Sequence, residues 1–451
     1  MVSTVDGLVS GLSTSSMIAS LLKVEAAPQT SLKTKVSTAE TIVNSYQSVN
    51  SRLATLKGAA DSVSQLSTWR AIKPTSSSTS VTATAVGGTS TTTGTLAFDV
   101  VSLAKAQVNT VRVAPAGDIT TADSITVKIG EGDEVAIDIS ADRSAQGISD
   151  AINKAGINVK ASVVTTGGSQ NVLQLSGSKT GAANSFTIGG LESADMKTSV
   201  AAQDAMLQVG GADEDGGFSV TSGTNTFTGL MAGVTVTVGK QETGVTLTVN
   251  SDVSGMSDKF QALVDAANAA LTEISSQTAY NPATKKGSPL TGDFMARQMS
   301  SSILGTVSSG LSFDDPNFVA DPAHPEITAT KISFGSLSKL GIQLDRGGQL
   351  TFDKEKFEAA YNADPAGIKQ AGMAFGDTFE ALATKQSDNV TASITGRKSV
   401  IDNYTTQIAN WDVRLAAKQT ALQKQYTGLE TALSKLQSQS TWLSGQIASL
   451  G

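Results

Sequence analysis

The sequence predicts an α+β multidomain fold in which terminal helices form an antiparallel coiled-coil stalk and a helical bundle, with an inserted antiparallel β head. Two observations predict the helices. A heptad repeat lies at each end of the chain, and no proline occurs between Pro28 and Pro74 or after Pro365. A third predicts the head, because apolar and polar residues alternate from Pro74 to about Asn250, as they do in half-buried strands.

The last sixty residues carry a large aliphatic side chain at every seventh position. These are Ile394, Ile401, Ile408, Leu415, Leu422, Leu429, Leu436, Leu443 and Leu450. As one helix this stretch would be about 85 Å long at 1.5 Å per residue, too long to lie inside one domain. Burying all these side chains would contribute at most about 15–25 kcal/mol. The stripe therefore predicts a packing partner.

The N-terminal region supplies part of that partner. Its apolar residues alternate steps of three and four in an a/d seam, formed by Ala39, Ile42, Tyr46, Val49, Leu53, Leu56, Ala60 and Val63. The companion positions of the C-terminal stripe shift one residue later in the heptad towards the end of the chain, which widens its apolar face. We expect the two ends to run antiparallel, with the middle of the chain carried at their far end.

The middle of the chain predicts strands around one helix. That helix covers residues 148–155, and Gly156 follows as its C-cap. With two strands before it and two after it, it forms a strand–strand–helix–strand–strand unit. Residues 234–238 and 245–249 are expected to close the head as a hairpin. Helices return at 256–271 and 294–307, and Asp353 is expected to cap a last short helix.

Four domains follow from these shifts in pattern. They are a terminal leg (1–40 and 405–451), a helical bundle (41–75 and 251–404), a β head subdomain (76–111 and 218–250) and a distal β/α subdomain (112–217).

Composition narrows the classes of function. The net charge is −7, which argues against binding of nucleic acid or of an anionic membrane surface. No apolar run approaches 18 residues, so no membrane span is expected, and residues 1–22 lack the basic start of a secretory signal peptide. The chain has no cysteine, which excludes disulfides and thiolate chemistry. Either such a chain has no need of cysteine, or it is exported unfolded and assembles outside the cell.

Signatures of catalysis are lacking. The single histidine, His324, stands in a proline-flanked loop, and there is no nucleophile elbow or phosphate-binding loop. The acidic run Asp213, Glu214 and Asp215 lacks the spacing of a calcium loop, and Asp314 with Asp315 is interpreted in the same way, as a solvated turn. We expect no catalytic residue, no cofactor and no metal. The chain is therefore predicted to be a structural or binding protein.

Motifs along most of the chain resemble those of one family. The N-terminal run is Gly7 to Thr14, followed by Ile18, Leu21, Leu22 and Pro28. Later motifs are Thr226–Leu230, Leu290–Asp293, Leu340–Ile342, Gly348–Asp353 and Gln437–Leu443. In this order they resemble the bacterial flagellar filament cap proteins, also called hook-associated protein 2. Ser13 stands where that family usually has aspartate. The unit around residues 125–188 is also similar to a repeat shared by hook-associated proteins and flagellins.

The resemblance implies a function. Such a protein would form a ring-like homo-oligomer, a pentamer being favoured, at the extracellular tip of the flagellum, where it retains exported flagellin and promotes its folding and insertion. Its partners would be flagellin, further copies of itself, the flagellar type III export apparatus and a cytoplasmic export chaperone. Two alternatives stay open: a hook–filament junction protein, and a tip adhesin that binds host glycans through the β head.

The residues expected to contact flagellin or other copies lie on the terminal helices. They are Leu8, Leu12, Ile18, Leu21, Leu22, Leu422, Leu429, Leu433, Leu436, Trp442, Leu443 and Ile447. Trp69, Trp411 and Trp442 are interpreted as packing anchors of the helical regions.

Overall fold

The computed structural model describes residues 11, 13–87, 91–166, 170–191, 195–211, 216–315, 318–319, 323 and 329–448. The chain divides into two compact units. The first contains Met1–Ser64 with Ser257–Gly451, and the second contains Gln65–Met256. Helices dominate the first unit and antiparallel sheets the second, which confirms the predicted α+β multidomain class.

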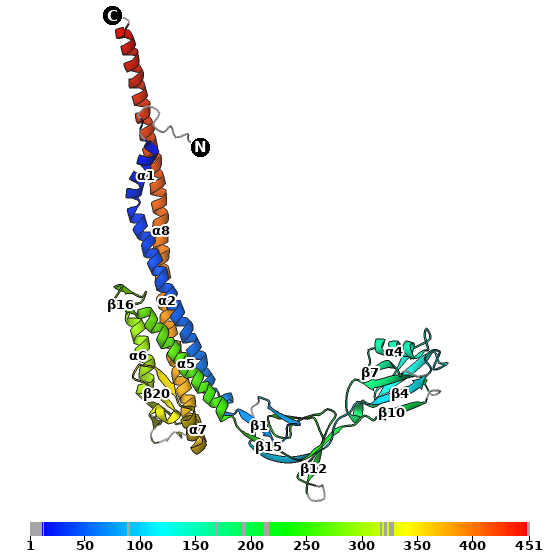
Figure 1. The fold of residues 1–451 in the computed structure, drawn as a ribbon. Helices are drawn as coiled ribbons and strands as arrows, with labels where there is room; N and C mark the ends of the chain where they lie inside the picture. Colours follow the sequence, from blue (N-terminus) through cyan, green and yellow to red (C-terminus); the bar gives the residue numbers. More distant parts are fainter. Residues whose placement is uncertain are drawn as a thin grey trace. The chain divides into compact units, whose positions relative to one another are not determined.

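Two long helices form the frame of the first unit (Figure 1). Helix α2 covers Ala27–Ser64 and follows the short α1, Thr14–Glu25, while α8 covers Pro365–Ala448 without a break. The amide of Gln29 donates to Asp412 at 2.5 Å, and the hydroxyl of Ser387 donates to Asn50 at 2.7 Å. Residue numbers thus rise in α2 as they fall in α8, so the predicted antiparallel pairing is confirmed.

The seam of α2 is buried as its heptads predict. Val49, Leu53, Leu56, Ala60 and Val63 are each fully buried. Where α2 ends, the helices touch backbone to backbone. A Cβ atom at Gly376 of α8 would lie 2.8 Å from the carbonyl oxygen of Ala60, so glycine permits this close approach.

Shorter elements complete the helical bundle of the first unit. They are α5 (Val253–Thr278), whose first residues belong to the second unit, α6 (Phe294–Ser308), α7 (Lys354–Ala363), the 3₁₀ turn η3 (Leu337–Leu340), and the strand pairs β16 (Tyr280–Asn281) with β17 (Lys286–Gly287), β18 (Leu311–Asp314) with β19 (Lys331–Gly335), and β20 (Ile342–Leu344) with β21 (Leu350–Phe352).

An aromatic cluster holds these elements together. The rings of Phe260, Phe357 and Phe375 come from α5, α7 and α8, with the centroid of Phe260 4.8 Å from that of Phe357 and 6.2 Å from that of Phe375. Asp353 accepts a hydrogen bond from the backbone N–H of Lys356 at 3.0 Å, so the predicted N-cap of α7 is confirmed.

The second unit contains two sheets around one of its cores. The five-stranded sheet has the order β1 (Ile72–Ser76), β15 (Glu242–Ser251), β3 (Gly94–Ser102), β11 (Ala205–Val209), β12 (Phe218–Ser222), and the three-stranded sheet has the order β13 (Thr226–Thr228), β14 (Val234–Val238), β2 (Val81–Ala85). The short helix α3 (Leu66–Trp69) precedes them. Pro74 lies in the edge strand β1, where a missing N–H is tolerated.

The prediction that residues 234–238 and 245–249 form a hairpin is wrong. Strand β14 pairs with β13 and β2, whereas β15 pairs with β1 and β3. Val236 and Leu247 are both fully buried in one shared core. The two strands therefore contribute side chains from different sheets to that core, and their alternating pattern fits this packing as well as it fits a hairpin.

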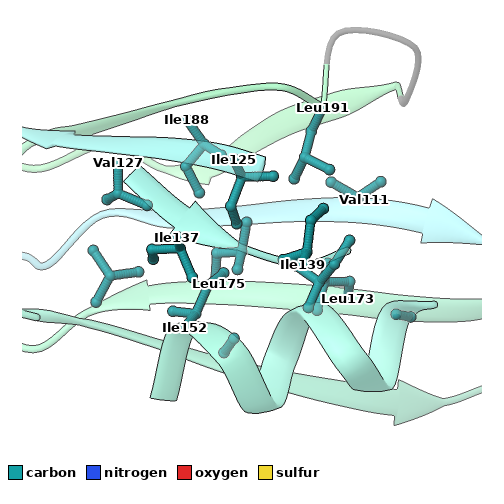
Figure 2. Close-up of a cluster of buried hydrophobic side chains, with 14 of the residues drawn as sticks. Val111, Ile125, Val127, Ile137, Ile139, Ile152, Leu173, Leu175, Ile188 and Leu191 are labelled. Carbon is teal, nitrogen blue, oxygen red and sulfur yellow. The ribbon is translucent and has the colours of Figure 1, made fainter. Parts of the chain in front are cut away.

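The second core of this unit lies under α4 (Ala145–Lys154) (Figure 2). Its sheets have the orders β10 (Met196–Val200), β4 (Val108–Val113), β8 (Asn171–Gly177), β7 (Val159–Thr165), and β6 (Glu134–Asp138), β5 (Ser124–Ile129), β9 (Phe186–Gly189); the 3₁₀ turn η1 (Ala182–Asn184) precedes β9. Ile152 of α4 packs with Leu173 and Leu175 of β8. The predicted strand–strand–helix–strand–strand order is confirmed, and Gly156 follows α4 with φ +68°.

The four-domain division predicted above stays a prediction. Strand β11 pairs with β3 on one side and with β12 on the other, which nevertheless argues that β11 belongs with the first head subdomain and not with residues 112–217. Within the described residues, no helix is long and apolar enough to cross a membrane.

Candidate docking surface on the terminal helices

Helix α1 has two apolar faces. Ile18 is 7% exposed and Leu22 is half-buried, and α1 contacts α8. Met17, Leu21 and Val24 follow one another at steps of four and three, and they are exposed. The inner face thus belongs to the stalk, whereas the outer row remains open for a partner.

The stripe of α8 divides into a packed part and an open part. Ile394 is buried, and Ile401 to Leu422 are half-buried at each heptad position. From there the exposed fraction rises to 49% at Leu429 and 60% at Leu436, and Leu443 and Ile447 are also exposed. Leu433 stays half-buried. The helix therefore continues past its intrachain partners with an apolar stripe that no described segment covers.

The open residues share one side of the helix, with one exception. At 100° per residue, Leu429, Leu433, Leu436, Leu443 and Ile447 fall within an arc of about 80°. Trp442 lies about 140° from Leu429 on the same scale. Its side chain is 66% exposed, so the interpretation of Trp442 as a packing anchor is wrong within the chain.

The other two tryptophans do pack. Trp69 is 5% exposed. Trp411 is half-buried, and the guanidinium of Arg414 lies 5.5 Å from the centroid of its ring.

The open end of α8 carries no charge. Residues 436–448 contain no Asp, Glu, Lys, Arg or His. Two of their hydroxyls donate to the helix itself: Ser438 to the carbonyl of Ser434 at 2.9 Å, and Thr441 to that of Gln437 at 2.9 Å. This end of the helix therefore offers apolar contact and shape to a partner but no charged side chain, so binding to it is expected to depend little on salt.

A polar clamp fixes the bundle next to the stalk. The hydroxyl of Tyr46 in α2 donates to Asp293 at 2.6 Å, and Asp293 also caps α6 by accepting from the N–H of Ala296 at 3.0 Å. The guanidinium of Arg397 in α8 lies 3.9 Å from Asp293 and 5.5 Å from the ring of Tyr46. Burial and the neighbouring carboxylate raise the pKa of Tyr46 to about 12. One carboxylate thus links α2, α6 and α8.

Some predicted residues lie outside the described residues. These are Leu8, Leu12 and Leu450 of the stripes, His324, and the acidic run at 213–215. Asp314 is described, and it pairs with Lys331 at 2.9 Å across β18 and β19. In the part of the chain that the structure describes, no group of three or more His, Cys, Asp or Glu side chains is placed to hold a metal ion.

Sequence reasoning missed two residues of the open surface. Met17 and Val24 stand beside Leu21 on the outer row of α1. Their spacing of i, i+4 and i+7 was the available signal. It shows that these residues share a face, but only the position of α1 against α8 shows which of its faces is covered.

Comparisons with known proteins agree with this architecture. The family profile described as "Flagellar hook-associated protein 2 C-terminus" matches residues 202–438, and that of the N-terminus matches residues 10–107. The flagellar hook-associated protein 2 of Escherichia coli is 27% identical and covers 98% of this chain and 97% of its own length. That of Salmonella typhimurium is 25% identical, with 73% of each chain covered.

A solved structure also shows similarity to a protein of this kind. The crystal structure of the D1-D2-D3 domains of the flagellar cap protein FliD from Escherichia coli covers 80% of this chain and 99% of its own length, with a TM-score of 0.56 and 26% identity. The family comprises structural flagellar cap proteins and is not an enzyme family. With matches to both of its terminal regions and an agreeing fold, the chain belongs to the flagellar hook-associated protein 2 family.

Proposed function

We propose that this protein is a filament cap: a homo-oligomer at the tip of the flagellum that retains exported flagellin and promotes its folding and insertion into the growing filament. The observation that carries the proposal is the open stripe at the end of α8, in which Leu429, Leu436 and Leu443 are about half exposed or more. An uncharged stripe of this kind suits docking into an apolar groove between helices.

The chemistry of the stripe suits a partner that must also be released. Each side chain contributes a modest apolar contact, and no ion pair at residues 436–448 fixes one orientation. A cap has to move on as each subunit is inserted below it. Docking by apolar contacts alone permits repeated release, and flagellin at the filament end is the partner that this proposal requires.

The remaining partners follow from the same proposal. A chain without cysteine can cross a narrow export channel unfolded without forming disulfides on the way. We assign its export to the flagellar type III apparatus with a cytoplasmic chaperone, and its assembly to a ring in which a pentamer is favoured.

Deletion of the gene tests the capping role directly. Flagellin is measured in the culture medium and in sheared filaments, in the deletion strain and in the same strain complemented with the wild-type gene. Monomeric flagellin in the medium with hooks that carry no filament is the expected result. Normal filaments on the deletion strain would remove the capping role.

The position of the protein separates the cap from the alternative of a hook–filament junction protein. Immunogold labelling of intact flagella should mark the distal tip, whereas label at the hook would favour the junction. The adhesin alternative predicts binding of the full-length protein to host glycans on an array. Such binding alone, with normal filaments in the deletion strain, would favour adhesion as the function.

A further inference from the structure

A short hairpin of the first unit exposes two aromatic side chains. Tyr280 begins β16 and is 57% exposed, and Phe294, at the first turn of α6 close behind the hairpin, is 75% exposed. Aromatic rings with this exposure are unusual on a free surface and are enriched at the centres of protein interfaces.

The hairpin is held in a defined conformation. Asn281 accepts hydrogen bonds from the N–H groups of Ala283 and Thr284 at 3.0 and 3.1 Å, which closes its turn. At its base, the hydroxyl of Thr291 donates to the carbonyl of Ala279 at 2.8 Å. Lys285 has φ +53°, a left-handed conformation that a lysine rarely adopts. A fixed hairpin can bind with little loss of conformational entropy.

The hairpin surface is basic as well as aromatic. Lys285, Lys286 and Arg297 are exposed, and residues 279–292 contain no acidic side chain. The next carboxylate, that of Asp293, is directed to Tyr46 and Arg397 in the polar clamp. We call Tyr280, Lys285, Lys286, Phe294 and Arg297 the basic hairpin surface.

A second surface, on α8 of the same unit, has the complementary chemistry. A hollow of 590 Å³ is lined by the carboxylates of Asp377, Glu380 and Asp388 and by one cation, Lys385. Lys57 of α2 pairs with Glu380 at 3.9 Å, so Asp377 and Asp388 are the carboxylates that a second molecule could use. Asp377 also lines an adjoining hollow of 430 Å³. The two hollows together form what we call the acidic hollow.

The adjoining hollow adds an apolar floor. Phe313 of β18 and Met373 and Ala374 of α8 line it beside Asp377. Lys331 and Asp314 also line it, and because they pair with each other at 2.9 Å they leave its charge to Asp377. The acidic hollow therefore complements the basic hairpin surface in two ways. Its negative charge matches the lysines, and its concave apolar floor matches the exposed aromatic rings.

The two surfaces cannot meet within one chain. Arg397 of α8 lies beside Asp293, close to the hairpin, whereas Asp388 and Asp377 are about 14 and 30 Å further along α8 at 1.5 Å per residue. The base of the hairpin is anchored by Leu290, which is 2% exposed. The complement must therefore come from another molecule.

We propose that the basic hairpin surface of one copy docks on the acidic hollow of the next copy, with Tyr280 or Phe294 against the apolar floor and the lysines beside Asp377 and Asp388. The contact joins two different surfaces of identical chains, so it is a head-to-tail contact of the kind that generates rings. It specifies the self-association that the proposed cap requires, and in that sense it rests on the proposed function.

Cysteine cross-linking of the full-length protein tests the contact, because the chain has no cysteine of its own. Lys285→Cys and Asp388→Cys proteins are purified separately, mixed under mild oxidation and resolved without reductant. A cross-linked dimer should form in the mixture at about ten times or more the yield of either protein alone. Thr55→Cys, at an exposed position of α2, replaces Asp388→Cys in the control mixture and should give no such dimer.

A charge swap provides a second measurement. Lys285→Glu with Lys286→Glu should weaken self-association by about tenfold or more in sedimentation, since two attractions become repulsions. Mixing this protein with the Asp377→Lys, Asp388→Lys double variant should restore association. Melting curves equal to wild type show that each variant is folded.

Three results would overturn the contact. These are self-association without the Lys285–Asp388 cross-link, absence of any self-association, and cross-linking of Lys285→Cys to a cysteine-substituted flagellin but not to Asp388→Cys. Loss of the capping role is a separate result, because it is measured by flagellin in the medium of the deletion strain.

Discussion

Replacing Leu436 by aspartate separates the docking of the stalk from its stability. Leu436 is 60% exposed in the free chain. Full burial of a leucine is worth about 1.5–3 kcal/mol, so covering the exposed part contributes about 1–2 kcal/mol to docking. A carboxylate buried in its place without a partner costs about 2 kcal/mol more. The expected loss of about 3–4 kcal/mol corresponds to a hundredfold to thousandfold weaker docking.

The folded chain itself should hardly change. The side chain has few partners to lose, and the lower helix propensity of aspartate costs about 0.5 kcal/mol. Ser438→Asp is the matched control, because it adds the same charge about 160° away from Leu436 on the helix. Each variant gene is introduced into the deletion strain in place of the complementing wild-type gene. Swimming in soft agar and flagellin in the medium are then measured, together with thermal unfolding of the purified proteins.

Leu436→Asp should abolish swimming and release flagellin, whereas Ser438→Asp should behave as wild type. Wild-type swimming with Leu436→Asp would refute the docking role of the stripe. Equal loss with both variants would show that charge anywhere at this end is harmful, and that the stripe is not specifically recognised.

The remaining predictions concern the first unit. Gly376→Ala should lower the free energy of unfolding by about 1–3 kcal/mol because its Cβ would press on the backbone of α2. Gly396→Ala on the same helix has open space around its Cβ and should raise that free energy by up to about 1 kcal/mol. Chemical denaturation of both variants measures the difference. Tyr46→Phe removes the hydroxyl that donates to Asp293 and should cost about 1.5–3 kcal/mol. The folded state raises the pKa of Tyr46 from 10.0 to about 12, so the free energy of unfolding of wild type should fall as pH rises from 10 to 12. The same fall in a pH series with Tyr46→Phe would show that ionisation of Tyr46 is not its cause. Asp353→Ala should cost about 1 kcal/mol through the lost cap of α7, and no shift in the melting temperature would count against the cap.

The sequence alone determined the features that depend on local periodicity. An apolar residue at every seventh position without proline specifies one long helix, and α8 is that helix. The same applies to the seam of α2, to α4 with Gly156, and to the cap at Asp353, because each requires only residues a few positions apart. The spacing also predicted Leu429, Leu436 and Leu443 as contact residues, and the structure leaves them exposed, although spacing cannot distinguish a covered stripe from an open one. Their docking role stays a prediction.

The tertiary structure decided what depends on residues far apart in the chain. The pattern of β14 and β15 fits a hairpin as well as it fits two packed sheets, and only pairing with β2 and β3 selected the sheets. Lys285 of the basic hairpin surface and Asp377 and Asp388 of the acidic hollow are about a hundred residues apart in the sequence, so their shared presence on one bundle could not be derived from any local pattern. Local periodicity fixes which face of an element is apolar, whereas the partner of that face is fixed by long-range packing.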